Sequence, residues 1–196
     1  APKFPSSLPV RFLLRYFKRY SHKEDLEMAS NSLNKMAGGG MYDHVAGGFH
    51  RYSTDAQWLV PHFEKMLYDN AMLSRAYLHA YLLSGKTAYR KICEDTLGFI
   101  LRELCITSQS GIGFLSSLDA DSEGEEGKYY RWRLEELKFS LINHTNESIN
   151  YWSFFQSAYD LPSNGNFEGD YLLRRKKDDS ELAEEFSIPI EQVQSY

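Results

Sequence analysis

The spacing of apolar and polar residues along the chain predicts pairs of helices separated by glycine-rich segments. Residues 9–20 carry apolar side chains on one helical stripe and the basic Arg11, Arg15 and Lys18 on the opposite side. Residues 23–37 repeat the helical spacing and end at a run of three glycines, which favours a helix terminus. These two segments predict a first helical hairpin. The stripe of residues 9–20 consists of Phe12, Leu13, Tyr16, Phe17 and Tyr20.

A second predicted hairpin follows after a long loop. Pro61 suits the first position of a helix that runs to about Leu83, and this helix is apolar on nearly every side, which is typical of a buried helix. Residues 87–104 have one apolar face only. The two helices therefore suggest an inner and an outer layer. The later segments predicted as helices are 134–141, 147–159, 179–186 and a further one that opens at Pro189.

Two segments rich in glycine and aromatic residues, 38–70 and 110–132, interrupt the helices. Each passes through acidic residues to a tryptophan before the next predicted helix. Two helices and one such loop, repeated, are typical of helical-repeat architecture. We therefore predict an all-α fold over residues 1–196 as a single domain. It is expected to be a partial (α/α) toroid of helical hairpins, with glycine-aromatic loops or short β-hairpins at one end.

Composition narrows the classes of function. The chain of 196 residues has a formal net charge of −5 and an isoelectric point near 5.7, which argues against a nucleic-acid-binding protein because such proteins present a basic face. It has no apolar run of membrane length and no signal peptide, so we expect no membrane partner and slightly favour a cytoplasmic over a secreted location. Its two cysteines lack the spacing of a metal or redox motif, and no cofactor is expected.

The loop residues 38–70 mix permissive glycines with side chains that can stack, donate or titrate. Such a mixture suits the rim and floor of a small-molecule cleft, and the high aromatic content favours ring-shaped ligands. For the aromatic residues the alternative is that they simply fill the core. The candidate ligand-binding residues are Tyr42, His44, His50, Arg51, Trp58, Tyr68, Asp69 and Asn70 here and Glu123, Tyr130 and Trp132 in the later segment.

Candidate catalytic residues are His62 and Glu64, at the expected start of the helix from Pro61, and Asp119 and Asp121 in the second segment. The positive end of a helix stabilises a carboxylate and lowers the pKa of a histidine. Two carboxyl groups across a cleft could cleave a glycosidic bond, and a histidine with a carboxylate could instead move a proton beside a sugar carbonyl. Asp121 and Glu64 are the first candidates for acid and base, and His62 the next.

Three structural alternatives remain open for these polar residues. His62 and Glu64 could cap a helix in which Lys65 and Asp69 form an ion pair one turn apart. The sequence from Asp119 to Gly124 matches the first half of a calcium loop, but position twelve is Tyr130 instead of a glutamate. His44 and His50 have no motif partners for a metal, so no metal site is expected.

The motifs GGMYDHVAGGFHRYSTDAQWLVPHFEKMLYDNA and LDADSEGEEGKYYRW, with APKFP at the start and NGNFEG later, strongly resemble a family of spermatogenesis-associated, thioredoxin-domain-containing proteins. The resemblance covers most of the chain. Members combine a thioredoxin-like module with a six-hairpin (α/α) toroid, related in fold to six-hairpin glycosidases and N-acylglucosamine 2-epimerases. It implies that this chain is a fragment without the thioredoxin-like module, which would be its partner in the full-length chain, and without the remaining hairpins.

Two hypotheses of different classes follow. The first is a toroid whose loop-end cleft acts on a carbohydrate or polyol, as a glycoside hydrolase or in an epimerase-like reaction. The second is a non-catalytic binding or regulatory scaffold that retains the fold. The resemblance alone does not choose between them, because a fold does not fix a function.

Overall fold

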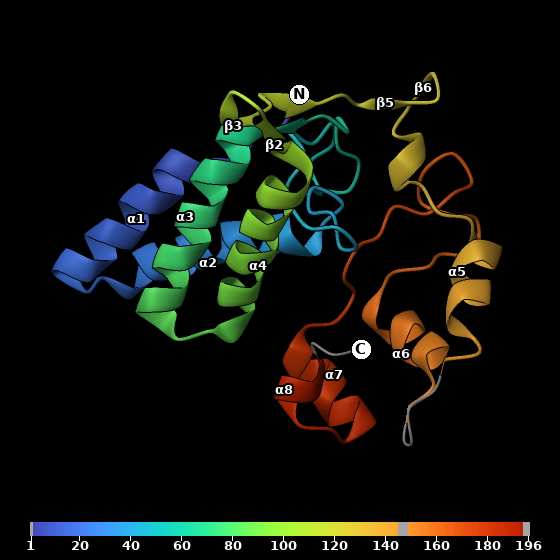
Figure 1. Cartoon of the computed structure of the whole chain (residues 1–196). Coiled ribbons are helices and arrows are strands. Elements are labelled where there is room, and N and C mark those ends of the chain that lie inside the picture. Colours follow the sequence, from blue (N-terminus) through green and yellow to red (C-terminus); the bar gives the residue numbers. More distant parts are fainter. Residues whose placement is uncertain (1, 145–148, 194–196) are drawn as a thin grey trace. The chain divides into compact units, whose positions relative to one another are not determined.

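A computed structural model describes residues 2–144 and 149–193 (Figure 1). The chain divides into two compact units, residues 1–129 and 130–196, and each is treated by itself below. In both units helices dominate, and the strands are only two to four residues long. The all-α prediction is confirmed. The expectation that residues 1–196 make a single domain stays a prediction.

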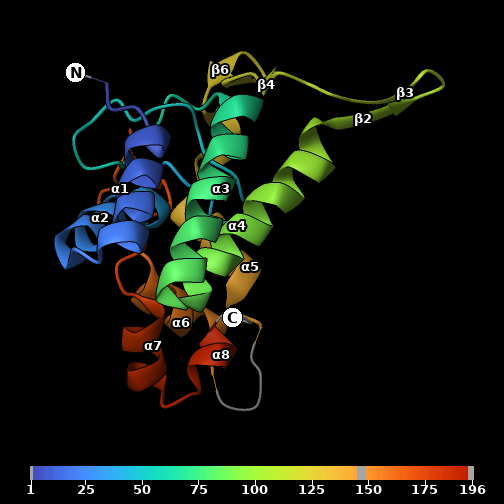
Figure 2. The same cartoon turned by 90° about the vertical axis from the view of Figure 1, so that its left-hand side faces the viewer.

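Two helical hairpins form the body of the first unit. α1 (Ser7–Tyr20) pairs with α2 (Lys23–Gly38), and α3 (Leu67–Ser84) pairs with α4 (Thr87–Phe99). α1 also packs along α3, and the two helices lie side by side in both Figure 1 and Figure 2. The predicted hairpins are therefore present.

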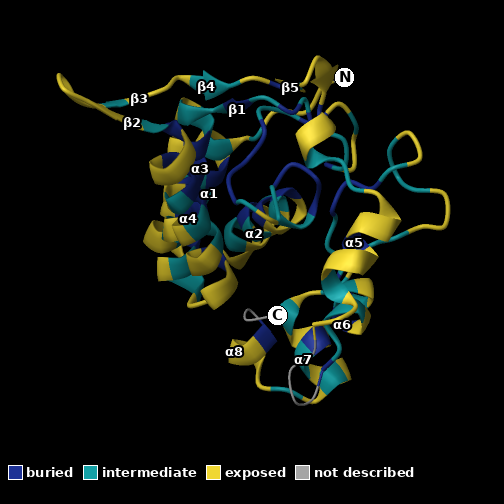
Figure 3. Ribbon diagram, turned by 45° about the vertical axis from the view of Figure 1, so that its right-hand side comes forward, coloured by how far each residue is buried: buried dark blue, intermediate teal, exposed yellow. Residues whose placement is uncertain are grey.

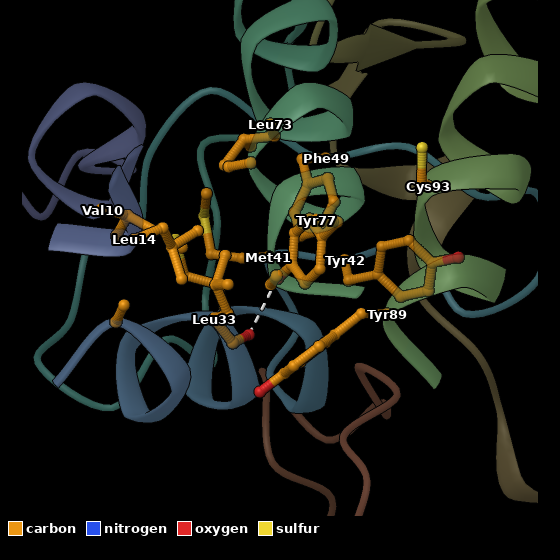
Figure 4. Close-up of a cluster of buried hydrophobic side chains, with 14 of the residues drawn as sticks. Val10, Leu14, Leu33, Met41, Tyr42, Phe49, Leu73, Tyr77, Tyr89 and Cys93 are labelled. Carbon is orange, nitrogen blue, oxygen red and sulfur yellow. Dashed lines mark hydrogen bonds between the residues drawn. The ribbon is translucent and has the colours of Figure 1, made fainter. Parts of the chain in front are cut away.

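The core of this unit lies between the helices and the loop that follows α2 (Figure 4). Tyr77 of α3 is fully buried, stacks on Phe49 of the loop with ring centroids 5.4 Å apart, and donates its hydroxyl hydrogen bond to the Leu33 carbonyl at 2.8 Å. Much of the loop is buried as well (Figure 3). Because a buried hydroxyl needs a hydrogen-bond partner, this bond fixes the position of α3 along α2.

The structure corrects three details of the predicted helices. The buried side of α1 is formed by Val10 and Leu14, whereas Phe12 is 63% exposed and Tyr16 and Tyr20 are also exposed. α3 begins at Leu67 and not at Pro61, and it is not enclosed on all sides, because its Leu82 is exposed. The helix predicted over 87–104 changes at Phe99 into a π-helix, η1 (Ile100–Leu104).

Short strands connect the loops of the first unit. β1 (Lys65–Met66) pairs with β4 (Ser117–Leu118). β2 (Cys105–Ser108) and β3 (Gly111–Phe114) form a hairpin that leads away from α4 (Figure 2). β5 (Asp121–Ser122) pairs with β6 (Glu125–Glu126). Short β-hairpins, which the predicted fold included, are therefore present as β2–β3 and β5–β6.

The second unit contains α5 (Leu134–Leu141), α6 (Tyr151–Ala158), α7 (Asp179–Phe186) and α8 (Ile190–Val193). α6 begins after Asn150, whose side chain accepts a hydrogen bond from the backbone of Ser153. The predicted helices are all found, although positions 147–148 of the segment predicted over 147–159 lie outside the described residues. η2 (Lys128–Tyr130), a 3₁₀ turn, spans the boundary of the units.

Candidate functional site

Asn70, in the first turn of α3, holds the glycine-aromatic loop against the helix. Its buried side-chain amide accepts a hydrogen bond from the Phe49 backbone N–H at 2.6 Å and donates to the Phe49 carbonyl at 3.0 Å, much as a neighbouring strand would. It also donates to the Met66 carbonyl. The amide of Asn70 is thus occupied by backbone, and the role that we expected in ligand binding stays a prediction.

Lys65 forms a buried ion pair with Asp43 of the loop. The Nζ–Oδ2 distance is 2.7 Å, the two side chains are 1% and 7% exposed, and Lys65 also donates to the Gly47 carbonyl. Burial lowers the pKa of Lys65, and the pKa of Asp43 lies below its usual value because Lys65 and two backbone amides outweigh the burial of the carboxylate. The predicted ion pair between Lys65 and Asp69 is wrong, because Lys65 precedes α3 and points into the loop.

His50 is a neutral core histidine in this arrangement. Its Nδ1 lies 2.9 Å from the Phe63 carbonyl, to which it donates, and the residue is 2% exposed. Burial, followed by the nearby charge of Lys65, lowers its pKa to about 3. His50 therefore stabilises the crossing of the loop with the segment before α3.

Two paired extended segments, residues 51–52 and 62–64, carry polar side chains that are partly exposed to solvent. The backbone N–H of Arg51 donates to the Glu64 carbonyl, and that of His62 donates to the Tyr52 carbonyl, both at 2.8 Å. Residues on paired extended segments lie side by side. As a result the Arg51 guanidinium bonds Glu64 Oε2 at 2.9 Å, and the rings of Tyr52 and His62 stack with centroids 4.8 Å apart.

Glu126 of β6 completes this group. Gly127 lies against the ring of Phe63, at a φ of +71°, and a Cβ at this glycine would collide with that ring. The close approach places the carboxylate of the preceding residue beside His62, with 2.9 Å between His62 Nδ1 and Glu126 Oε1. Arg51, Tyr52, His62, Glu64 and Glu126 are called the His62 cluster below.

The His62 cluster has the geometry of an oriented acid–base group. An ionised carboxylate only accepts hydrogen bonds, so the Nδ1 of His62 donates to Glu126, and in the neutral form of the ring Nε2 is the acceptor. Nε2 lies 4.0 Å from Glu64, and the His62 side chain is 32% exposed. The expected effect of a helix N-terminus on His62 and Glu64 is wrong, because both precede α3 in extended backbone.

Asp69 lies beside the His62 cluster in the first turn of α3. Burial raises the pKa of its carboxyl to about 6, against the opposing effects of Tyr68 and Arg51, and the charge of Glu64 adds to the rise. One carboxylate oxygen of Asp69 and the Nε of Arg51 are shielded from solvent without a hydrogen-bond partner. Tyr68 itself is exposed. The structure thus brings together five of the predicted site residues: Arg51, His62, Glu64, Tyr68 and Asp69.

Three other predicted residues of the first loop contact protein groups. The Tyr42 hydroxyl donates to Asp95 at 3.2 Å, and burial raises its pKa above the usual value. Nε2 of His44 lies 3.0 Å from the Gly39 carbonyl. Trp58 is buried at a φ of 64°, with the Lys3 ammonium 4.3 Å from its ring centroid. These contacts secure the loop, and a direct role of the three in ligand binding stays a prediction.

The carboxylates of the second segment are exposed. Asp119 accepts a bond from the Asp121 backbone, Asp121 lies in β5, and Glu123 pairs with Lys128 at 2.9 Å. Among residues 2–144 and 149–193, no group of three His, Cys, Asp or Glu side chains is placed to hold a metal ion. Tyr130 and Trp132 belong to the second unit, where Trp132 pairs with Tyr171.

Two members of the His62 cluster were not predicted. Tyr52 was one aromatic among many in the first segment, and Glu126 was one of several acidic residues in the second. The pairing of β1 with β4 joins the two segments, but it involves only two residues of each strand. Such a short pairing leaves no periodic pattern. The glycine after Glu126 was the one available signal, since it marks a close backbone approach.

Comparisons with known proteins support the family. No protein-family model matches the chain. In an alignment of 179 residues that covers 85% of this chain, the chain is 41% identical to spermatogenesis-associated protein 20 from Homo sapiens and 40% identical to the protein of the same name from Mus musculus. The matched part is 22% of each of these proteins, so the chain spans about a fifth of the curated relatives that it matches.

Two solved structures share the fold. A cellobiose 2-epimerase from Spirochaeta thermophila matches 61% of this chain and 29% of its own, with a TM-score of 0.54 and 20% identity. A sugar epimerase from a ruminal bacterium matches 67% of this chain and 34% of its own, with a TM-score of 0.54 and 16% identity. In the described part of the chain, no helix has the length and apolar character needed to cross a membrane. The chain belongs to the spermatogenesis-associated protein family, and its helices adopt the fold of part of an (α/α) toroid like those of the sugar epimerases.

Proposed function

We propose that the first unit carries a carbohydrate site at the His62 cluster, where His62 transfers a proton beside the carbonyl carbon of a reducing sugar. The observation that carries this proposal is the hydrogen bond between His62 Nδ1 and Glu126, which orients the ring and leaves Nε2 available. A histidine held by a carboxylate in this way is a general base. The likeness in fold to two sugar epimerases supports the class of substrate.

The same geometry favours proton transfer over hydrolysis of a glycosidic bond. Hydrolysis by two carboxyl groups requires an acid and a base on opposite sides of the bond. Glu64 is already paired with Arg51, and Asp119 and Asp121 are exposed on the β5–β6 side of the unit.

In the proposed step, Nε2 of the neutral His62 takes the proton from the carbon next to the carbonyl group. The electron pair of the broken C–H bond forms a C=C bond, and the carbonyl oxygen becomes the negatively charged enolate oxygen. Glu126 stabilises the imidazolium that forms, and Arg51 is the cation of the cluster that can stabilise the enolate. Return of the proton from the His62 imidazolium regenerates the neutral ring, and it gives the epimer when the enolate has turned its opposite face toward Nε2.

The test is exchange of the carbon-bound proton in D₂O, followed by ¹H NMR with glucose, mannose, N-acetylglucosamine and cellobiose. For the sugar that exchanges, His62→Gln is expected to lower the rate about 100-fold or more, the usual contribution of a general base. Glu126→Gln is expected to lower kcat more than it changes KM, because it removes the negative charge that stabilises the imidazolium. His22→Gln is the matched control, since His22 also lies near a carboxylate, Asp25, at 3.8 Å.

Circular dichroism establishes that each variant is folded. An unchanged exchange rate in His62→Gln would refute the proposal. Sugar binding that persists in the wild-type chain without any exchange would favour the alternative function, a non-catalytic binding scaffold. Release of a free sugar from cellobiose that depends on Asp121 would favour hydrolysis.

A further inference from the structure

A cluster of basic residues separate from the His62 cluster lies on α1 and α3. Arg11, Arg15 and Lys18 follow one another at helical spacing on α1, and Arg75 and His79 lie one turn apart on α3. The two helices pack side by side (Figures 1 and 2). These five residues are called the basic face. The sequence placed the three residues of α1 on one side of a helix, but it did not predict that Arg75 and His79 would join them.

The charges of the basic face repel one another. After burial, the largest influences that lower the pKa of Arg11 are Arg75 and Arg15. The pKa of His79 is lowered by burial and then by Arg11, Arg15, Arg75 and Lys18. Cations on different helices therefore lie within electrostatic reach of one another, and each disfavours the charge of the next.

Acidic residues are scarce on the two helices that carry this face. α1 has no Asp or Glu, and α3 has one, Asp69, which lies in its first turn. Across the described residues, no ion pair involves a member of the basic face, whereas on α4 Arg90 pairs with Glu94 and Lys91 with Asp95. The Nε of Arg11 is shielded from solvent and has no hydrogen-bond partner. Such a buried donor is costly unless a ligand satisfies it.

Apolar side chains border the basic face on both helices. Leu8, Phe12 and Tyr16 are exposed along α1 at intervals of four residues, and Leu78 and Leu82 are exposed on α3. Spacing of four residues forms the ridges by which helices pack against other helices. The surface thus combines an uncompensated positive charge with unpartnered apolar ridges.

We propose that the basic face and its apolar border bind an acidic amphipathic helix of a protein partner. Its carboxylates would bond Arg11, Arg15 and Arg75, and its apolar side would cover Phe12 and Leu78. A planar guanidinium matches a carboxylate with two parallel hydrogen bonds, which favours an acidic protein surface. The exposed apolar ridges at four-residue spacing match another helix, which favours a protein partner over a membrane surface.

The probe is a designed peptide of about 20 residues in which leucines at helical spacing form one side and glutamates flank them. Its binding to the 196-residue chain is measured by fluorescence anisotropy, and a peptide of the same composition in scrambled order is the control. Binding of the designed peptide is expected to weaken at least tenfold in the double variant Arg15→Glu/Arg75→Glu, and severalfold when salt is raised. Phe12→Ser is expected to weaken it without lowering the melting temperature, since Phe12 is exposed.

The matched control is Lys23→Glu/Lys35→Glu, which changes the net charge equally by exposed residues of α2 and is expected to leave affinity within about twofold. Absence of binding, or equal binding of the scrambled peptide, would overturn the proposal. Binding to phosphatidylserine vesicles that is lost in the Arg15→Glu/Arg75→Glu variant would identify a membrane site instead. Self-association of the chain that is lost in the same variant would identify a second copy as the occupant.

Discussion

Among single residues, Lys65 and Asp43 place an ammonium group and a carboxylate together in the interior of the first unit. The ammonium also lies 4.5 Å from the ring centroid of Phe99 and donates to the Gly47 carbonyl. Removing two charges from water costs several kcal/mol for each, and the pair offsets this only while both members are present. The pair therefore joins the loop to the segment before α3, and replacing either residue alone should destabilise this junction.

Lys65→Met should lower the free energy of unfolding by about 3–5 kcal/mol, because it leaves the Asp43 carboxylate buried and unpaired. Asp43→Asn should have a similar effect by leaving the ammonium unpaired. The double variant should be more stable than the sum of the two single effects predicts. Urea unfolding of the four proteins measures this coupling, and strictly additive losses would contradict it.

Asp69 lowers the stability of the folded protein at neutral pH, in contrast to the ion pair of Lys65 and Asp43. Its pKa of about 6 in the folded protein exceeds the ordinary value of 3.8, so the folded state binds more protons than the unfolded state between these values. Asp69 therefore reduces stability above pH 6, and the reduction disappears as the pH falls toward 3.8. Asp69→Asn should raise the melting temperature at pH 8 and have little effect at pH 4.

Asp121→Asn is the control for this experiment, since it removes an exposed carboxylate elsewhere in the same unit. A gain in melting temperature that is equal at both pH values would show that Asp69 is not the group responsible.

At this scale the sequence offered His62 and Glu64 as candidates but gave them the wrong surroundings. Both were chosen because they follow Pro61, at the expected start of a helix. Their actual partners, Glu126 and Arg51, lie on other segments, and a pairing of that kind depends on the tertiary fold. Lys65 was misassigned for the same reason, since its partner Asp43 is 22 residues away in the chain.

Among the elements, α3 shows how a helix end is specified. Gly85 adopts a φ of 72° and its N–H donates to the Tyr81 carbonyl, which closes the helix in the left-handed conformation that glycine adopts most readily. Gly98, in α4, has ordinary helical backbone and open space where a Cβ would lie.

Gly85→Ala should destabilise the protein by about 1 kcal/mol, because alanine is strained at positive φ. Gly98→Ala should stabilise it by about 0.5–1 kcal/mol, because alanine loses less conformational entropy in a helix. Both variants replace glycine by alanine, and chemical unfolding measures the change in the free energy of unfolding for each. Effects of the same sign would contradict this explanation.

The helices with clear periodicity and glycine ends were predictable, and the segment from Pro61 to Met66 was not. Pro61 is as compatible with extended backbone as with a helix start, and the segment becomes extended because it pairs with residues 51–54 and with β4. The apolar stripe on α1 was misplaced because aromatic residues at four-residue spacing suggest a buried side. The structure exposes them beside the basic face.

For the molecule as a whole, acid stability should be set by the loop of the first unit. The pKa of His50 is about 3 in the folded protein, against 6.5 ordinarily, so the unfolded state binds the extra proton between these values. Stability from His50 is lost as the pH falls from 6.5 toward 3, and that from Asp43 is lost below its ordinary value of 3.8. In the described second unit no buried histidine contributes such a loss.

We expect Trp58, the sole tryptophan of residues 1–129, to report this loss by fluorescence in a chain with Trp132→Phe and Trp152→Phe. This chain also carries Asp69→Asn, because Asp69 would otherwise change stability with pH in the direction opposite to His50. His50→Gln should flatten the dependence of unfolding free energy on pH between 6.5 and 3, whatever its effect on absolute stability. An unchanged slope would show that another group controls acid unfolding.

At this scale the sequence predicted the repeated hairpins and the family, because long motifs and helical periodicity are local properties of the chain. It did not predict that residues 1–129 and 130–196 would form separate compact units. The division falls within η2, directly after the polar residues 121–128, which include the β5–β6 hairpin. Compactness depends on contacts between distant residues, and periodicity does not report them.

The burial of Lys65 should also make its amine unusually slow to react with amine-modifying reagents. Reagents that modify amines attack only an accessible, unprotonated nitrogen, and the Nζ of Lys65 is enclosed by Asp43, Gly47 and Phe99. In the native protein this amine should remain unlabelled while exposed lysines such as Lys23 react. The rate at which Lys65 becomes labelled would therefore measure how often the loop separates from the segment before α3.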